Sequence, residues 1–231
     1  MLTVENLSFA YGTVGILRNI NMQMQTGRMT CVIGRNGVGK TTLLKNIMGL
    51  LKSSEGTVRL DEKDLSSLPA NKRARAGLGF VPQGRQIFPK LTVEENLRVG
   101  LEARNDSQKN IPDEIYTLFP VLKEMAQRRG GDLSGGQQQQ LSIGRALAGD
   151  PKVLVLDEPT EGIQPNIIQQ IGQVLRELVE SRDVTVILVE QYLDFVREFG
   201  HDFYIIDRGQ VMESGKTQQL TEEMVQAHLS V

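Results

Sequence analysis

The chain is poor in the residues that bind metals or form disulfides. Its 231 residues include one cysteine, Cys31, and two histidines, His201 and His228. A single cysteine excludes an internal disulfide and a zinc site built from cysteines, and two histidines are too few for most metal clusters. The scarcity of cysteine indicates a reducing, cytoplasmic setting.

Long apolar segments and a strong net charge are also missing. No segment approaches the ~20 consecutive apolar residues that a helix needs to cross a bilayer. Residues 1–5 contain neither the basic nor the apolar region of a secretory signal peptide, so none is expected. With 26 Lys and Arg against 28 Asp and Glu, the net charge is −2. This near-neutral charge does not indicate nucleic-acid binding, and the sequence contains no basic tract that would.

The pattern of apolar residues changes twice along the chain. Strand-like segments are frequent in residues 1–83, helical periods dominate residues 84–150, and strands alternating with helices resume in residues 151–231. Such alternation favours an α/β fold with a mostly parallel sheet. We therefore expect a single domain over residues 1–231, in which an α/β core of residues 1–83 and 151–231 is interrupted by a helical subdomain at residues 84–150.

Periodicity and turn residues also predict the separate elements. Strands are expected at residues 2–9, 29–34, 56–60, 78–81, 153–156 and 184–189. A closing hairpin around Gly209 is expected from residues 203–206 and 210–212. Helices are expected from Lys40 to a stop at Gly49, and at residues 93–101, 113–125, 136–147 and 167–179.

A glycine-rich loop after the strand at residues 29–34 contains the clearest chemical motif. It matches the P-loop pattern G-x-x-x-x-G-K-[ST] at every fixed position. Glycines let backbone N–H groups surround phosphate oxygens, Lys40 supplies positive charge to the β- and γ-phosphates, and Thr41 offers a hydroxyl to Mg²⁺. A chance match is disfavoured because a strand precedes the loop and a helix follows it. The predicted nucleotide-binding residues here are Gly34, Asn36, Gly37, Gly39, Lys40, Thr41 and Thr42.

A second motif places two carboxylates at the end of a buried strand. Four apolar residues, 153–156, lead directly into Asp157 and Glu158. Ligands of α/β proteins bind at this end of the strands. Asp157 suits Mg²⁺ coordination, usually through water, and Glu158 suits polarising a water for attack on the γ-phosphate. The alternative is that the two acids are merely solvated at a strand end, and the presence of a P-loop in the same chain disfavours it.

Residues 133–137, Leu-Ser-Gly-Gly-Gln, are similar to the signature that separates ABC ATPases from other P-loop proteins. With this motif, the whole chain resembles the ATP-binding subunit of an ABC transporter. The resemblance implies a RecA-like P-loop NTPase core, an N-terminal antiparallel β part and an inserted helical subdomain. It also implies that two subunits pair head to tail, and that each covers the other's nucleotide with Ser134, Gly135, Gly136 and Gln137.

Other positions match the family one by one, some with departures. Tyr11 stands where the family stacks an aromatic ring on adenine, although an ordinary turn tyrosine is the alternative. Gln83 matches the glutamine that senses Mg²⁺. Gln191 stands where the family usually has a histidine near the γ-phosphate; glutamine can donate a hydrogen bond but carries no positive charge. This departure concerns the rate of hydrolysis more than ATP binding. We expect His201, ten residues later, to be structural.

The exact residues of several motifs indicate a subfamily of ABC transporters. Residues 84–89, 158–162 and 189–191 resemble the smaller ATP-binding subunit of branched-chain amino-acid and amide-type importers. Residues 161–165, residues 130–133 and the glutamine run at 137–140 are together most similar to the urea importer's subunit. The resemblance implies an ATPase on the cytoplasmic face of the membrane that powers import of a small polar solute. The implied partners are a second ATP-binding subunit, identical or paralogous, transmembrane permease subunits contacted near Phe88 and Pro89, and indirectly a substrate-binding protein.

Two alternatives belong to other classes. A non-transport ABC ATPase acting on DNA or ribosomes is disfavoured, because the chain has one nucleotide module, no heptad run and no basic tract. A subunit that binds ATP with weak or no hydrolysis stays open because of Gln191.

Overall fold

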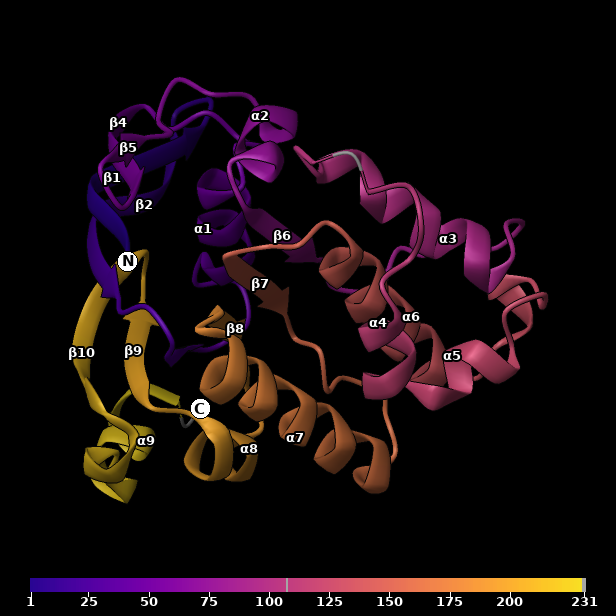
Figure 1. Ribbon diagram of the computed structural model, residues 1–231. Helices are drawn as coiled ribbons and strands as arrows, with labels where there is room; N and C mark the ends of the chain where they lie inside the picture. Colours follow the sequence, from indigo (N-terminus) through magenta and orange to yellow (C-terminus); the bar gives the residue numbers. More distant parts are fainter. Residues whose placement is uncertain (107, 230–231) are drawn as a thin grey trace.

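A computed structural model describes residues 1–106 and 108–229 of the protein. Two sheets form its α/β core (Figure 1). The larger sheet has the order β10-β9-β3-β8-β7-β6 and is parallel except for β10, which runs antiparallel to β9. Its strands are β3 (Met29–Ile33), β6 (Leu78–Val81), β7 (Val153–Asp157), β8 (Thr185–Val189), β9 (Asp202–Asp207) and β10 (Gln210–Lys216). The predicted fold class, with its mostly parallel sheet, is confirmed.

The smaller sheet is the antiparallel N-terminal part, with the order β2-β1-β4-β5. Its strands are β1 (Leu2–Tyr11), β2 (Val14–Met24), β4 (Glu55–Leu60) and β5 (Lys63–Asp64). We did not predict β2, because bulges in its pairing with β1 interrupt the alternation of its buried residues. The helices α1 (Lys40–Ile47) and α2 (Ala70–Arg75) lie on the same side of the molecule as this sheet (Figure 1).

The central strands are apolar throughout because both faces of the larger sheet are covered. Every residue of β3, β7 and β8 is buried. Alternate residues point to opposite sides, so that Ile187 and Val189 pack with α1 and the smaller sheet while Val186 and Leu188 pack on the other side. That second side is covered by α7 (Pro165–Arg182) and α8 (Leu193–Phe199).

Helices replace strands between β6 and β7, as predicted. They are α3 (Val93–Gly100), α4 (Asp113–Leu118), α5 (Pro120–Glu124) and α6 (Gly135–Ala148), with short 3₁₀ turns η1 (Leu101–Ala103) and η2 (Gly130–Asp132). The single helix expected at residues 113–125 is wrong. Pro120 disfavours helical backbone at Phe119, which adopts φ −132° and ψ 75°, and a new helix starts at the proline.

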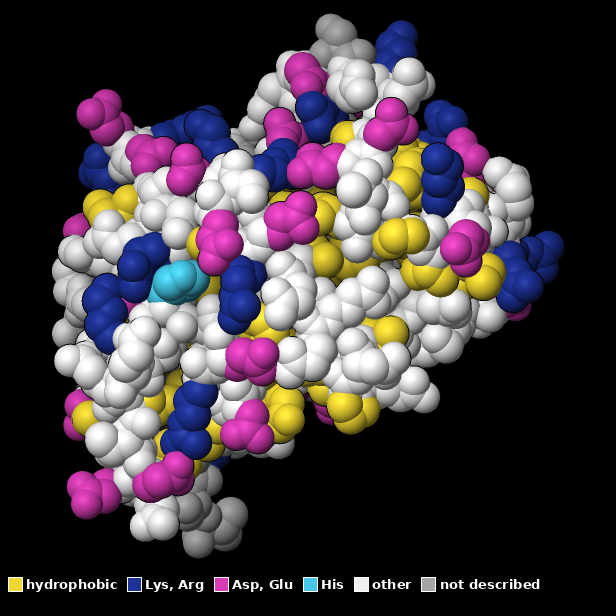
Figure 2. Space-filling model, turned by 60° about the horizontal axis from the view of Figure 1, so that its bottom comes forward, with side chains coloured by type: hydrophobic (Ala, Val, Ile, Leu, Met, Phe, Trp, Pro, Cys, Tyr) yellow, Lys and Arg dark blue, Asp and Glu magenta, His cyan; other side chains and the backbone are white. Residues whose placement is uncertain are grey.

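The last elements follow the closing hairpin of β9 and β10. They are the turn η3 (Thr217–Gln219) and the helix α9 (Glu222–Leu229). On the face shown in Figure 2, Lys and Arg side chains are interspersed with Asp and Glu, so charge of both signs is mixed there. Within the described residues, no helix combines the length and the apolar character that crossing a membrane requires.

Candidate functional site

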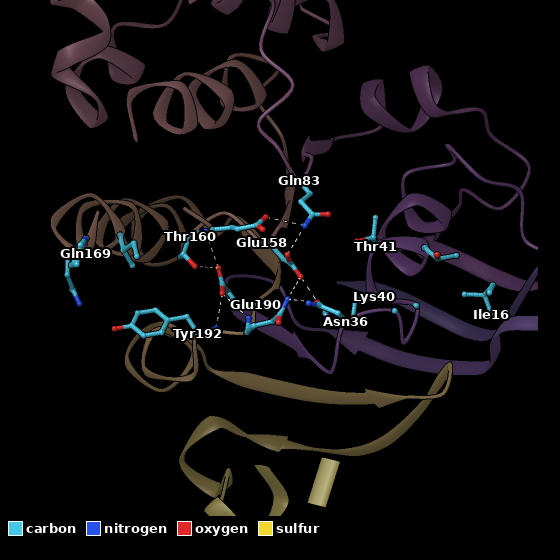
Figure 3. A pocket seen from close by; sticks show the side chains of 17 residues that line it. Ile16, Asn36, Lys40, Thr41, Gln83, Glu158, Thr160, Gln169, Glu190 and Tyr192 are labelled. Atoms are coloured by element: carbon cyan, nitrogen blue, oxygen red, sulfur yellow. Dashed lines mark hydrogen bonds and ion pairs between the residues drawn. The ribbon is translucent and has the colours of Figure 1, made fainter. Parts of the chain in front are cut away.

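A cavity of about 830 Å³ opens at the carboxyl ends of the parallel strands (Figure 3). The P-loop between β3 and α1 forms one wall. The segments that follow β6, β7 and β8 contribute the others, because parallel strands all end at this edge of the sheet. The polar residues that line it are Asn36, Lys40, Thr41, Thr42, Gln83, Glu158, Thr160, Glu161, Gln169, Glu190, Gln191 and Tyr192.

Glycine is required in the P-loop for two different reasons. Gly39 has φ +109°, which side chains other than hydrogen rarely permit. A Cβ atom on Gly34 would lie 2.4 Å from the carbonyl oxygen of Ile206, on the neighbouring strand β9. The loop can therefore adopt its curled shape against the sheet only with glycine at these positions.

Lys40 points back into the P-loop. Its Nζ donates hydrogen bonds to the carbonyl oxygens of Gly34, at 2.7 Å, and Arg35, at 2.8 Å. The side chain is buried, and this burial lowers the Lys40 pKa, although the carboxylates of Glu158 and Asp157 oppose the shift. Phosphate oxygens that enter the loop would give this ammonium group a charged partner in place of neutral carbonyls.

Thr41 and Asp157 meet where a magnesium ion was predicted. The Thr41 hydroxyl donates to Asp157 Oδ1 at 3.2 Å. Asp157 Oδ2 is buried and has no hydrogen-bond partner among the residues described, and burial raises the Asp157 pKa. A cation would supply the missing partner of this oxygen. Within the same residues, no group of three or more His, Cys, Asp or Glu could hold a metal ion alone.

Glu158 is held from two sides by glutamine side chains. Gln83 Nε2 donates to its Oε2 at 2.8 Å, and Gln191 Nε2 donates to its Oε1 at 2.5 Å. Lys40 Nζ lies 4.0 Å from the same Oε1. Glu158 itself adopts φ +50°, an uncommon backbone conformation that recurs at functional sites. Three separately predicted residues thus converge on the predicted general base.

Gln191 also connects Glu158 to the P-loop. Its Nε2 donates to Asn36 Oδ1 at 2.7 Å in addition to the Glu158 carboxylate. The amide therefore lies between the P-loop and Glu158, and its correspondence to the family's histidine stays a prediction. The interaction with Asn36 orients Gln191 without any charge.

Glu190 is a functional residue candidate that the sequence prediction missed. Only 2% of its surface is exposed, and its carboxylate accepts hydrogen bonds from Thr160 and from the N–H groups of Gln191 and Tyr192. Burial raises the Glu190 pKa, while these hydrogen bonds oppose the shift. The pattern that could have identified it is the one used for Asp157: an acid directly after a strand of apolar residues.

Tyr11 does not line the cavity. It lies at the end of β1 with 51% of its surface exposed, and its ring meets that of Phe9 edge-on at 4.8 Å between centroids. Ile16, on β2, lines the cavity instead. Stacking of Tyr11 on adenine stays a prediction.

The signature residues line a second cavity. Ser134, Gly135, Gly136 and Gln137 begin α6 and face a hollow of about 400 Å³ together with residues 162–164. The Ser134 hydroxyl accepts a hydrogen bond from the Gln137 N–H, and the Gln137 side chain accepts one from the Ser134 N–H. The chain therefore has its P-loop and its signature in different cavities.

His201 is structural, as expected. It precedes β9, and its Nδ1 accepts a hydrogen bond from the backbone N–H of Met29 at 3.1 Å. The cavity lining does not include it.

Known proteins resemble the chain over nearly its whole length. The sequence pattern of the family described as ABC transporter matches residues 17–161. The high-affinity branched-chain amino acid transport ATP-binding protein BraG of Pseudomonas aeruginosa is 38% identical over 214 residues, which are 92% of this chain and 91% of BraG. The probable branched-chain amino acid transport ATP-binding protein LivF of Archaeoglobus fulgidus is 34% identical, with 96% and 94% covered.

Solved structures are similar as well. The dimeric post-hydrolysis structure of the ATP-binding cassette MJ0796, bound to ADP and Pi, superposes with a TM-score of 0.85 at 27% identity. The match covers 95% of this chain and 100% of that one.

Proposed function

Because the chain belongs to the ABC transporter family of ATP-binding domains, we propose that it powers the import of a small polar solute, namely urea, an amide or a branched-chain amino acid. It is an ATPase and the ATP-binding subunit of a transporter. The observation that carries the proposal is the convergence of the P-loop, Glu158 and Gln191 in one cavity, where Thr41 also binds the buried Asp157. Family membership favours this function over a non-transport ATPase.

The residues at the cavity would have separate roles in ATP hydrolysis. The P-loop N–H groups and Lys40 bind the phosphates, and Thr41 and Asp157 would hold Mg²⁺ with Gln83 nearby. Bound Mg²⁺ supplies positive charge to the β- and γ-phosphates. Glu158 orients the attacking water and accepts its proton, while Gln83 and Gln191 fix the carboxylate by donating to different oxygens.

A second ATP-binding subunit is part of the proposal. The signature cavity contains hydroxyl and N–H groups at a helix start and is separate from the P-loop cavity. Head-to-tail pairing would bring the signature of one subunit onto the nucleotide of the other. The MJ0796 cassette is dimeric by its description. The partner is a second copy or a paralogous chain.

ATP binding would draw the two subunits together, and hydrolysis would release them. The helical subdomain, residues 84–150, would transmit this motion to the permease. Phe88 is 45% exposed and lies beneath the Arg145 guanidinium, whose central carbon is 5.1 Å from the ring centroid. Phe88 and Pro89 are the proposed contacts. The subunit would thus lie peripherally on the cytoplasmic face of the membrane, and the system would obtain its solute from a substrate-binding protein.

Gln191 is predicted to contribute modestly to turnover. We expect Gln191→Ala to lower kcat about fivefold, because the Glu158 carboxylate loses one of its two amide donors while Gln83 remains. Gln191→His should restore or raise the rate. Steady-state phosphate release at saturating ATP measures both. Complete loss in Gln191→Ala, with no gain in Gln191→His, would contradict a modest role.

The transport proposal is tested by uptake in cells that lack the gene. Loss of the gene should abolish uptake of labelled urea or of labelled leucine, and the wild-type gene should restore it, whereas a Glu158→Gln gene should not. The solute whose uptake is lost identifies the substrate class. Unchanged uptake of urea, small amides and branched-chain amino acids would reject the proposal.

A further inference from the structure

The loops that carry Glu158 and Gln191 are joined in the cavity wall by one buried carboxylate, that of Glu190. Glu190 Oε1 accepts from the Thr160 hydroxyl at 2.5 Å and from the Thr160 N–H at 3.1 Å. Its Oε2 accepts from the N–H groups of Gln191, at 2.9 Å, and Tyr192, at 3.1 Å. In Figure 3 the Glu190 side chain lies between Thr160 and Tyr192. All four partners are donors, so the arrangement suits an ionised carboxylate.

Burying this charge is unfavourable, and the described residues place no basic side chain in an ion pair with it. The four hydrogen bonds compensate, and they fix the backbone of two segments that come from neighbouring strands, β7 and β8. A neutral side chain of the same size could not accept all four of these hydrogen bonds.

We propose that Glu190 is a positioning residue for ATP hydrolysis, which acts by holding the Gln191 amide against the Glu158 carboxylate. The backbone N–H of Gln191 is bound to Glu190, and its side chain reaches Glu158 at 2.5 Å and Asn36 at 2.7 Å. Thr160, two residues after Glu158, binds the opposite oxygen of Glu190. The carboxylate thus sets the distance between the two loops. Glu190 itself does not touch the reacting atoms.

This inference rests on the proposed role of Gln191, and a double-mutant cycle separates the two. In Glu190→Gln, an amide NH₂ would replace one oxygen and face either the N–H groups of Gln191 and Tyr192 or the N–H and hydroxyl of Thr160, so hydrogen bonds to one loop are lost and the loops lose their alignment. We expect kcat to fall about fivefold while the Kd for ATP changes less than about twofold, since the P-loop is not bound by Glu190. In the Gln191→Ala background, the same substitution should lower kcat less than about twofold further, because its target is already absent.

The controls distinguish positioning from general destabilisation. Glu190→Asp keeps the charge and should recover part of the rate. Thr160→Val removes one donor while keeping its size, and should give a smaller loss that also disappears with Gln191→Ala. Asp194→Asn removes an exposed carboxylate at the start of α8 and should leave kcat unchanged. Thermal unfolding of each variant shows whether the fold is retained; if Glu190→Gln does not fold, the Thr160→Val cycle decides.

Each result supports or overturns a definite claim. Losses that multiply fully in the double mutants would overturn the positioning role of Glu190, as would a fall in ATP affinity equal to the fall in kcat. A wild-type rate for Gln191→Ala would instead reject the role proposed for Gln191, and the inference about Glu190 with it.

Discussion

Lys40→Ala should lower the rate of ATP hydrolysis by a factor of about 100 or more, because it removes the buried positive charge aimed at the phosphates. The ammonium group now satisfies two P-loop carbonyl oxygens, those of Gly34 and Arg35. Alanine would leave these without their donor and would leave the carboxylates Asp157 and Glu158 to repel the triphosphate. ATP affinity should therefore fall together with turnover.

Phosphate release and binding of a fluorescent ATP analogue measure the two effects of Lys40→Ala. Lys52→Ala, an exposed lysine beyond α1, is the matched control and should behave as wild type. If Lys40→Ala hydrolysed ATP at the normal rate, the assignment of the phosphate site to this loop would be wrong.

Glu158→Gln should preserve ATP binding and stop hydrolysis. The substitution keeps the size of the side chain but removes the proton acceptor, an effect worth roughly 100-fold or more for a general base. The P-loop, Thr41 and Asp157 are untouched, so nucleotide still binds. ATP that cannot be cleaved should then accumulate between paired subunits.

Single-turnover hydrolysis with limiting ATP measures this loss directly. Glu161→Gln is the matched control, because Glu161 lines the same cavity and accepts from Gln83 at 3.1 Å, but does not meet Gln191. Its loss of activity should be much smaller. A wild-type rate in Glu158→Gln would show that another group accepts the proton.

The parts of the site that sequence could predict are those whose residues are contiguous. The P-loop and the acids after β7 each occupy one strand end, so local spacing is enough to identify them. Glu190 also directly follows a strand of apolar residues, but its role could not be predicted, because that role depends on Thr160, a distant residue that only the parallel pairing of β7 and β8 brings near. Tyr11 matched the family by position, yet the cavity wall at that edge is formed by Ile16.

The same distinction applies to the fold. Strands buried on both faces were predicted well, because their apolar runs need no partner to be recognised. Helix 113–125 was expected as one element because its apolar period continues past Pro120, whereas the proline restricts the backbone before it. The seven-residue helix α8 was missed since so short a segment contains barely two turns of periodicity.

In the proposed mechanism, the Ser134 region of one subunit covers the ATP that is bound in the P-loop of the other. The mass of Glu158→Gln in solution, measured by light scattering with ATP and with ADP, tests it most directly. With ATP, we predict about twice the chain mass of 25.7 kDa, either for the purified chain alone or for the chain mixed with a paralogous ATPase subunit. With ADP, we predict separate chains. Adding Ser134→Arg should restore separate chains that still bind ATP. If ATP-bound Glu158→Gln stayed monomeric both alone and in the presence of the paralogous subunit, this mechanism would be contradicted.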